Sequence, residues 1–266
     1  MSDRTGILLV AFGSSREEAH ISLRRFEDMT RERFPGLPVR WAFSSGVVRS
    51  KLADKGKKTD SASKALEKMW FEKYRRVAVQ SLHVIPGDEY HELLHVAESF
   101  RAESRIFDSL TVGGPLISTP GDVARTADAV FKHIPEDRSP AEAVVLMGHG
   151  TWHPGDSAYD LLFDELQSRD ENVLVATMDG SLTIEGVRDR LKAKGVKKAH
   201  LMALLAVAGR HVQKDMCGQG PDSWVSVLES SGIECSCVPH GTAGYPDFAQ
   251  IWLDHLEKAL AELGSA

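Results

Sequence analysis

The sequence predicts an α/β protein made of two similar units whose parallel sheets face a central cleft. Short apolar runs alternate with segments of helical length, which is the pattern of βαβ units with parallel strands. The series occurs twice along the chain, and glycines follow corresponding runs in both copies. A chain of 266 residues is long enough to give each copy a core of its own.

The first copy begins with a strand close to the start of the sequence. Residues 7–12 are apolar and end at Gly13, where the backbone can turn sharply. A segment of helical length, 17–34, follows this strand. Beyond it, the predicted strands are 39–46, 77–82 and 109–112, and the predicted helix is 61–73.

The second copy repeats this order. Its first strand starts at Val144 and ends in Gly148-His149-Gly150. The predicted strands that follow are 173–180, 200–205 and 234–238, and the predicted helices are 157–169 and 183–194. Gly195 closes the second helix as its C′ residue, and 247–263 is typical of a closing amphipathic helix.

The boundary between the copies is best placed at 135–140, a polar segment flanked by prolines. The predicted domains are therefore 1–134 and 141–266. Alignment on glycine places Phe12-Gly13-Ser14 over His149-Gly150-Thr151, which favours a duplication. Ligands of paired α/β domains bind in the cleft between them.

Composition excludes several classes of function. Hydrophobic residues make up 42% and charged residues 26% of the chain, and the net charge of −6 gives no broad basic face for nucleic acid. No apolar run approaches a membrane span or resembles a signal peptide, so we expect no membrane partner. Three cysteines make no disulfide framework and fit a reducing compartment. We therefore expect a cytoplasmic protein in which Cys235 and Cys237 are near-core thiols rather than metal ligands.

The sequence indicates no nucleotide cofactor. It contains neither a P-loop nor the glycine fingerprint of dinucleotide-binding domains, because 113–118 lacks the third glycine and carries a proline. Ser14 and Ser15 lack the Gly-x-Ser-x-Gly context of serine hydrolases.

Two histidines and one aspartate follow strands of the second copy. His149 ends the first strand, Asp179 follows the second and His211 follows the third. The carboxyl ends of parallel strands form the ligand-binding edge of such sheets. Each residue alone is explained by a turn or a helix cap. Together, two imidazoles and a carboxylate suit a divalent first-row metal with open coordination positions.

A second histidine pair follows the zinc-protease pattern literally. His91-Glu92-Leu93-Leu94-His95 places two imidazoles on one helix face. The motif is short, no third ligand is obvious, and the duplicated α/β pattern disfavours a protease. We interpret His91 and His95 as an exposed face, with a subunit contact, an adventitious metal or haem as open alternatives.

At these residues the chain resembles the class II, ATP-independent chelatases, and more narrowly the anaerobic cobalt chelatases that insert Co²⁺ into sirohydrochlorin during cobalamin biosynthesis. The resemblance spans nearly the whole chain and is carried by the segments 8–15, 79–90, 147–151 and 209–211. It implies two Rossmann-like, chelatase-type domains with a tetrapyrrole cleft. It also implies a metal site of two histidines and a glutamate, which map onto His149, His211 and Asp179. Asp179 departs from the family pattern, because aspartate is one methylene shorter than glutamate.

The resemblance also suggests roles for individual residues. We expect His149 to be both metal ligand and proton acceptor, since imidazole accepts protons near neutral pH. Glu89, with Asp88 as the less favoured alternative, would carry protons away across the cleft. Phe12, Ser14 and Arg210 are the expected macrocycle-binding residues. The expected cationic residues at the rim, facing the carboxylates of sirohydrochlorin, are Arg210, Arg49, Lys51 and Arg16.

Three alternatives remain open at the level of the sequence. One is iron insertion to make sirohaem, and Fe²⁺ or Ni²⁺ would suit the same ligands. Another is a metal or tetrapyrrole carrier without turnover. The third concerns assembly: the protein is a possible homo-oligomer, because the sequence does not determine the oligomeric state.

Overall fold

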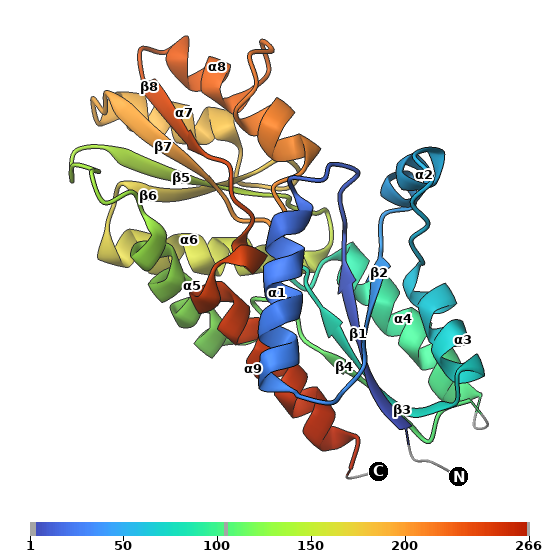
Figure 1. Ribbon diagram of the computed structural model, residues 1–266. Helices are drawn as coiled ribbons and strands as arrows, with labels where there is room; N and C mark the ends of the chain where they lie inside the picture. Colours follow the sequence, from blue (N-terminus) through green and yellow to red (C-terminus); the bar gives the residue numbers. More distant parts are fainter. Residues whose placement is uncertain (1–3, 104–105, 265–266) are drawn as a thin grey trace.

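The computed structural model describes residues 4–103 and 106–264, and it contains two four-stranded parallel sheets flanked by helices (Figure 1). The first sheet has the order β2-β1-β3-β4 and the second the order β6-β5-β7-β8. The two sheets therefore share one topology, which confirms the predicted fold class. The ends of the predicted domains, 1–3 and 265–266, lie outside the described residues.

The strands lie close to their predicted positions. The first sheet consists of β1 (Arg4–Ala11), β2 (Val39–Phe43), β3 (Tyr74–Ser81) and β4 (Ser109–Gly113). The second consists of β5 (Ala143–Gly148), β6 (Val173–Thr177), β7 (Lys198–Ala203) and β8 (Glu234–Val238). In each sheet the first strand pairs on both sides, so Leu8 lies opposite Arg40 and Val79, and Val145 opposite Leu174 and Leu201. β5 is buried along its whole length and β1 from Gly6 to Ala11, as expected for sheets covered on both faces.

Helices connect the strands. In the first half they are α1 (His20–Arg33), α2 (Gly46–Asp54), α3 (Ala62–Phe71), α4 (Asp88–Ala102) and α5 (Pro120–His133). In the second half they are η1 (Pro154–Asp156), α6 (Ser157–Arg169), α7 (Ile184–Ala193), the π-helical turn η2 (Val212–Met216), α8 (Trp224–Glu229), η3 (Thr242–Gly244) and α9 (Pro246–Glu262). α2, α5, α8 and the short η turns were not predicted from the sequence.

The last helix crosses to the first sheet. α9 packs on β3 and β4, and Thr111 Oγ1 donates a 2.8 Å hydrogen bond to the carbonyl of Ala259 (Figure 1). In the opposite direction, α5 of the first half packs on α6 of the second. The two halves therefore share a continuous hydrophobic core. α9 closes the first sheet rather than the second, and the division at 135–140 stays a prediction.

One prediction about the cysteines is wrong. Cys217, at the end of η2, and Cys237, on β8, form a disulfide with a Cα–Cα separation of 6.0 Å. Cys235 remains a free thiol, and burial raises its pKa to about 12. Spacing along the strand excluded a Cys235–Cys237 bond, but it did not reveal that the η2 turn brings Cys217 to the strand.

Within the described ranges, none of the helices combines the length and apolar character needed to cross a membrane.

Candidate functional site

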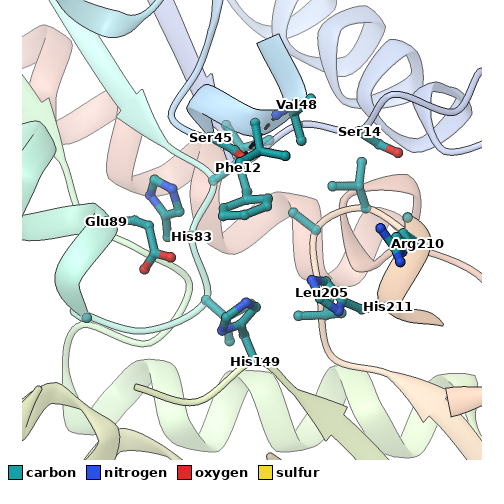
Figure 2. A pocket seen from close by; sticks show the side chains of 18 of the residues that line it. Phe12, Ser14, Ser45, Val48, His83, Glu89, His149, Leu205, Arg210 and His211 are labelled. Atoms are coloured by element: carbon teal, nitrogen blue, oxygen red, sulfur yellow. Dashed lines mark hydrogen bonds between the residues drawn. The ribbon is translucent and has the colours of Figure 1, made fainter. Parts of the chain in front are cut away.

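A cavity of about 530 Å³ lies where the loops that follow the strands of both sheets come together (Figure 2). The first half supplies the loops after β1 and β3 and part of α2, and the second half supplies the loops after β5 and β7 together with η2. Apolar side chains cover much of the wall, among them Phe12, Val48, Leu82, Val84, Ile85, Leu205 and Val207. A pocket of this size and character suits a flat, largely apolar ligand with polar groups at its edge.

His149 projects into this cavity from the end of β5 (Figure 2). Its Nδ1 lies 3.1 Å from the carbonyl oxygen of Gly150 and must donate to it, which leaves Nε2 free. Gly150 has φ +78°, and a Cβ there would lie 1.6 Å from the carbonyl oxygen of Asp179. The glycine is therefore required for the turn that presents His149.

His211 faces His149 across the cavity (Figure 2). The ring centroids are 5.5 Å apart and the planes nearly perpendicular, at 86°. His211 Nδ1 donates to Asp215 Oδ2 at 2.7 Å, so its Nε2 is free as well. Asp215, one turn further along η2, was missed by the sequence analysis, because the spacing of four residues identifies such a pair only once the segment is known to be helical.

Asp179 lies beside His149 but not between the two imidazoles. Its Oδ2 is 3.9 Å from His149 Nδ1, the nitrogen already bonded to Gly150, and its side chain is 51% exposed. Asp179 does not line the cavity. Among residues 4–103 and 106–264, no three histidine, cysteine or acidic side chains are grouped as a metal site. The two histidines are therefore brought together, whereas Asp179 stands next to one of them.

The opposite wall carries Phe12, His83 and Glu89 (Figure 2). The Phe12 ring lies 5.9 Å from that of His149. The two nitrogens of His83 contact the hydroxyls of Ser81, at 2.8 Å, and Ser44, at 3.2 Å. Burial lowers the pKa of His83 to about 4 and outweighs the opposite effect of Glu89, so this imidazole is neutral near pH 7.

His83 was not singled out from the sequence as a site residue. The available signal was its position just after the third strand of the first copy, at the same edge of the fold as His149. Asp88 is already engaged, because its Oδ2 accepts a 2.7 Å hydrogen bond from Thr151 Oγ1. Glu89 lines the cavity and Asp88 does not, which favours Glu89 as the acidic group facing a ligand.

The remaining predicted residues are placed as follows. Ser14 is buried, lines the cavity and accepts a hydrogen bond from the amide of Arg16. Arg210 and Lys51 also line the cavity. Arg49 does not, since its guanidinium donates to the carbonyl oxygens of Phe43 and Ser44, so it supports the end of β2 rather than the rim.

The zinc-protease pattern on α4 does not form a metal site. His91 Nδ1 donates to the carbonyl oxygen of Gly87 at 3.0 Å, and the ring packs against His153 with centroids 4.2 Å apart. His95 is exposed. This pair lies outside the cavity.

Comparison with known protein families and sequences gives consistent matches along nearly the whole chain. The family model described as cobalt chelatase (CbiK) matches residues 5–261. The sirohydrochlorin cobaltochelatase CbiKC of Nitratidesulfovibrio vulgaris is 50% identical over 260 residues, which cover 98% of this chain and 92% of the relative. The sirohydrochlorin cobaltochelatase of Salmonella typhimurium is 30% identical and covers 97% of each chain.

Solved structures of chelatases share the fold. SirB from Bacillus subtilis with Fe³⁺ superposes with a TM-score of 0.66 at 15% identity and covers 98% of both chains. The sirohydrochlorin chelatase SirB from Bacillus subtilis subspecies spizizenii, in complex with cobalt, gives a TM-score of 0.62 at 13% identity and covers 97% of this chain and 96% of its own. At these identities the likeness concerns the two-sheet architecture alone.

Proposed function

The chain belongs to the cobalt chelatase (CbiK) family, and from this premise we propose that it inserts Co²⁺ into sirohydrochlorin. The observation that carries the proposal at the site is the pair of imidazoles at His149 and His211. Their ring centroids lie 5.5 Å apart in an apolar cavity, and in each ring Nδ1 is hydrogen-bonded while Nε2 has no partner among the described residues.

Metal insertion exchanges one Co²⁺ for two pyrrole protons, so the site must deliver a cation and accept protons. Neutral imidazoles bind first-row divalent metals, and two of them hold the ion with positions left open for the ring nitrogens. Asp215 fixes the ring of His211, as carboxylates commonly do behind ligating histidines. We propose that Asp179 acts on the ion through His149 or through water, because its carboxylate lies on the Nδ1 side of that ring.

The two pyrrole protons that the metal replaces need acceptors beside the ring. We propose that His149 accepts one proton after the metal has left it, and that Glu89 receives protons across the cavity and passes them to solvent. Phe12 and Ser14 would contact the macrocycle from the first half. His83 lies near this route for the protons. Because burial keeps its imidazole neutral, it adds no positive charge that would repel the metal ion.

We extend the proposal to the finer points that the family name leaves open. The reaction would use no nucleotide and would take place in the cytoplasm. Co²⁺ would be the substrate metal, with Fe²⁺ and Ni²⁺ as the alternatives to be compared. A homo-oligomer stays a prediction.

The decisive experiment is anaerobic incubation of the purified protein with sirohydrochlorin and Co²⁺, both in excess, while the visible spectrum is followed against a protein-free control. We expect many turnovers per chain, and a decrease of about 100-fold or more in His149→Ala. His95→Ala, an exposed histidine outside the cavity, is the matched control and should keep full activity. Saturation at one equivalent would instead identify a carrier, and a higher kcat/KM with Fe²⁺ would identify an iron chelatase.

A further inference from the structure

Three cationic side chains line the cavity without an ion-pair partner among residues 4–103 and 106–264. Lys51, Arg210 and Lys214 line it, and none of them has a side-chain hydrogen bond or ion pair within the described part of the chain. Elsewhere the charged side chains are commonly paired, as Arg33 is with Asp254 and Glu257. Unpaired cations gathered at one cavity point to an anionic ligand.

Two of these cations also belong to a second, polar cavity, which we call the annex. It has a volume of about 650 Å³ and shares Arg210, Lys214 and Asp215 with the main cavity. Its other lining residues are Arg16, Gln213 and residues 218–223. The annex therefore continues the site on the side of η2 with a wall that differs chemically from the apolar main cavity.

The acidic residues of the annex do not cancel its cations. Asp215 already accepts the hydrogen bond of His211. Asp222 is exposed, and within the described ranges the side chain of Arg16 has a single ion-pair contact, at 3.9 Å, with the exposed Glu18. Arg210 and Lys214 are thus the groups with free donors between the apolar cavity and the annex.

Charge differs between the two sides of the main cavity. Figure 2 shows Glu89 on one side and Arg210 on the other, with Phe12 and His149 between them. An acid-bearing ring is repelled by Glu89 and attracted by Arg210 and Lys214, so the asymmetry gives the ring a preferred orientation.

We propose that the annex is a carboxylate subsite, in which Arg210 and Lys214 bind acidic side chains on one edge of the macrocycle while its flat face lies in the apolar cavity. Arg16 also lines the annex, whereas Lys51 lines the main cavity from α2. The inference rests on the proposed function, because it takes the ligand to be a tetrapyrrole. Arg210 and Lys214 would then select rings rich in carboxylates and determine which edge of the ring faces η2.

The test compares two fluorescent porphyrins that differ in charge, uroporphyrin with eight carboxylates and coproporphyrin with four. Their dissociation constants are measured by fluorescence, without metal, for the wild type and for Arg210→Met combined with Lys214→Met. We expect the wild type to prefer uroporphyrin, and the double variant to lose about tenfold in uroporphyrin affinity and most of the preference. Added salt should weaken uroporphyrin binding by the wild type more than by the variant.

Two further variants separate recognition from folding. Lys197→Met removes an exposed lysine just before β7, outside both cavities, and should change neither constant. Arg210→Lys should restore part of the preference, because it keeps the charge. A wild type without the preference, or a double variant that keeps it, overturns the subsite. The binding assay requires no turnover. If the wild type failed to insert metal, the proposed function would be overturned, but the measured porphyrin affinities would still decide whether the annex binds carboxylates.

Discussion

The contact between His211 and Asp215 determines which nitrogen of the imidazole is available. Because a carboxylate only accepts hydrogen bonds, the proton is on Nδ1 and the lone pair on Nε2. His149 reaches the same state by donating to a backbone carbonyl. Both rings are therefore prepared for metal before any metal arrives, which lowers the cost of ordering them on binding.

Asp215→Asn tests this preparation at the scale of one residue. The amide can donate to Nδ1 and so favours the other tautomer of His211. We expect Co²⁺ affinity to fall about 10- to 100-fold with little change in the free energy of unfolding. Calorimetric titration with Co²⁺ measures the effect, and Asp215→Glu should recover part of it. An Asn variant with wild-type affinity would show that His211 needs no orienting carboxylate.

His83 makes stability depend on pH. Burial lowers its pKa to about 4 in the folded protein, whereas an unfolded histidine has its ordinary value near 6.5. Between these values the unfolded chain binds the additional proton, so stability falls as the pH is lowered from 6.5 to 4. The full effect is on the order of 3 kcal/mol, since each unit of difference in pKa is worth about 1.4 kcal/mol.

Urea denaturation across this pH range checks the expectation. The loss of stability on acidification should be smaller in His83→Gln than in the wild type, whatever the variant's stability at pH 7. His95→Gln, at an exposed site, should follow the wild-type slope. If His83→Gln also followed that slope, the titrating group would lie elsewhere.

At the residue scale, the sequence predicted what depends on strand ends. His149 and His211 were identified because a histidine after a buried strand reaches the ligand-binding edge whatever the details of the loop. Other features depend on contacts between loops, which the local sequence pattern does not reveal. These are the role of Asp215, the burial of His83 and the hydrogen bonds of Arg49 to backbone carbonyls.

Among the elements, η2 links the site to the edge of the second sheet. It begins directly after His211, presents Lys214 and Asp215 to the cavity, and ends at Cys217, whose disulfide reaches β8. The cross-link closes a loop with a sequence separation of 20 residues. A loop of this length corresponds to about 3 kcal/mol of stabilisation in the chain-entropy model.

Removal of the disulfide should therefore act on both stability and metal binding. We expect Cys217→Ser with Cys237→Ser to lower Tm and to weaken Co²⁺ binding several-fold, because η2 loses its anchor. Calorimetry with and without a reductant measures this, and reduction should lower the Tm of the wild type but not of the double variant. Cys235→Ser, which removes the free thiol, is the control. Equal Tm values in all three proteins would show that the cross-link does not hold η2.

α2 and α5 were missed for different reasons. α2 has only one fully buried residue, Leu52, so its apolar pattern is weak, although Ser45 caps it. Thr119 caps α5 in a capping box with Asp122, and Pro120 is the first residue of the helix; this signal was present in the sequence and was overlooked. The strands were easier to predict because burial on both faces makes them continuous apolar runs.

On the scale of the molecule, the exchange of helices joins the two sheets. α9 follows the second sheet in sequence but packs on the first, and Trp252 at its centre is fully buried, with its indole nitrogen donating to the carbonyl of His83. The duplication was visible in the sequence because each copy repeats the same strand order. The crossing was not, since an amphipathic helix does not specify which apolar surface it covers.

Trp252→Ala tests whether the two halves unfold as one unit. The cavity left by the indole should cost about 3–5 kcal/mol. Because α9 contacts the first sheet and shares the core with residues of the second, we expect this loss to lower a single calorimetric transition, with equal calorimetric and van't Hoff enthalpies. Phe71→Ala, at a side chain that is mostly exposed, should leave the transition where it is. If Trp252→Ala instead split the transition, with the first sheet melting ahead of the second, the halves would be independent domains and α9 would belong to only one of them.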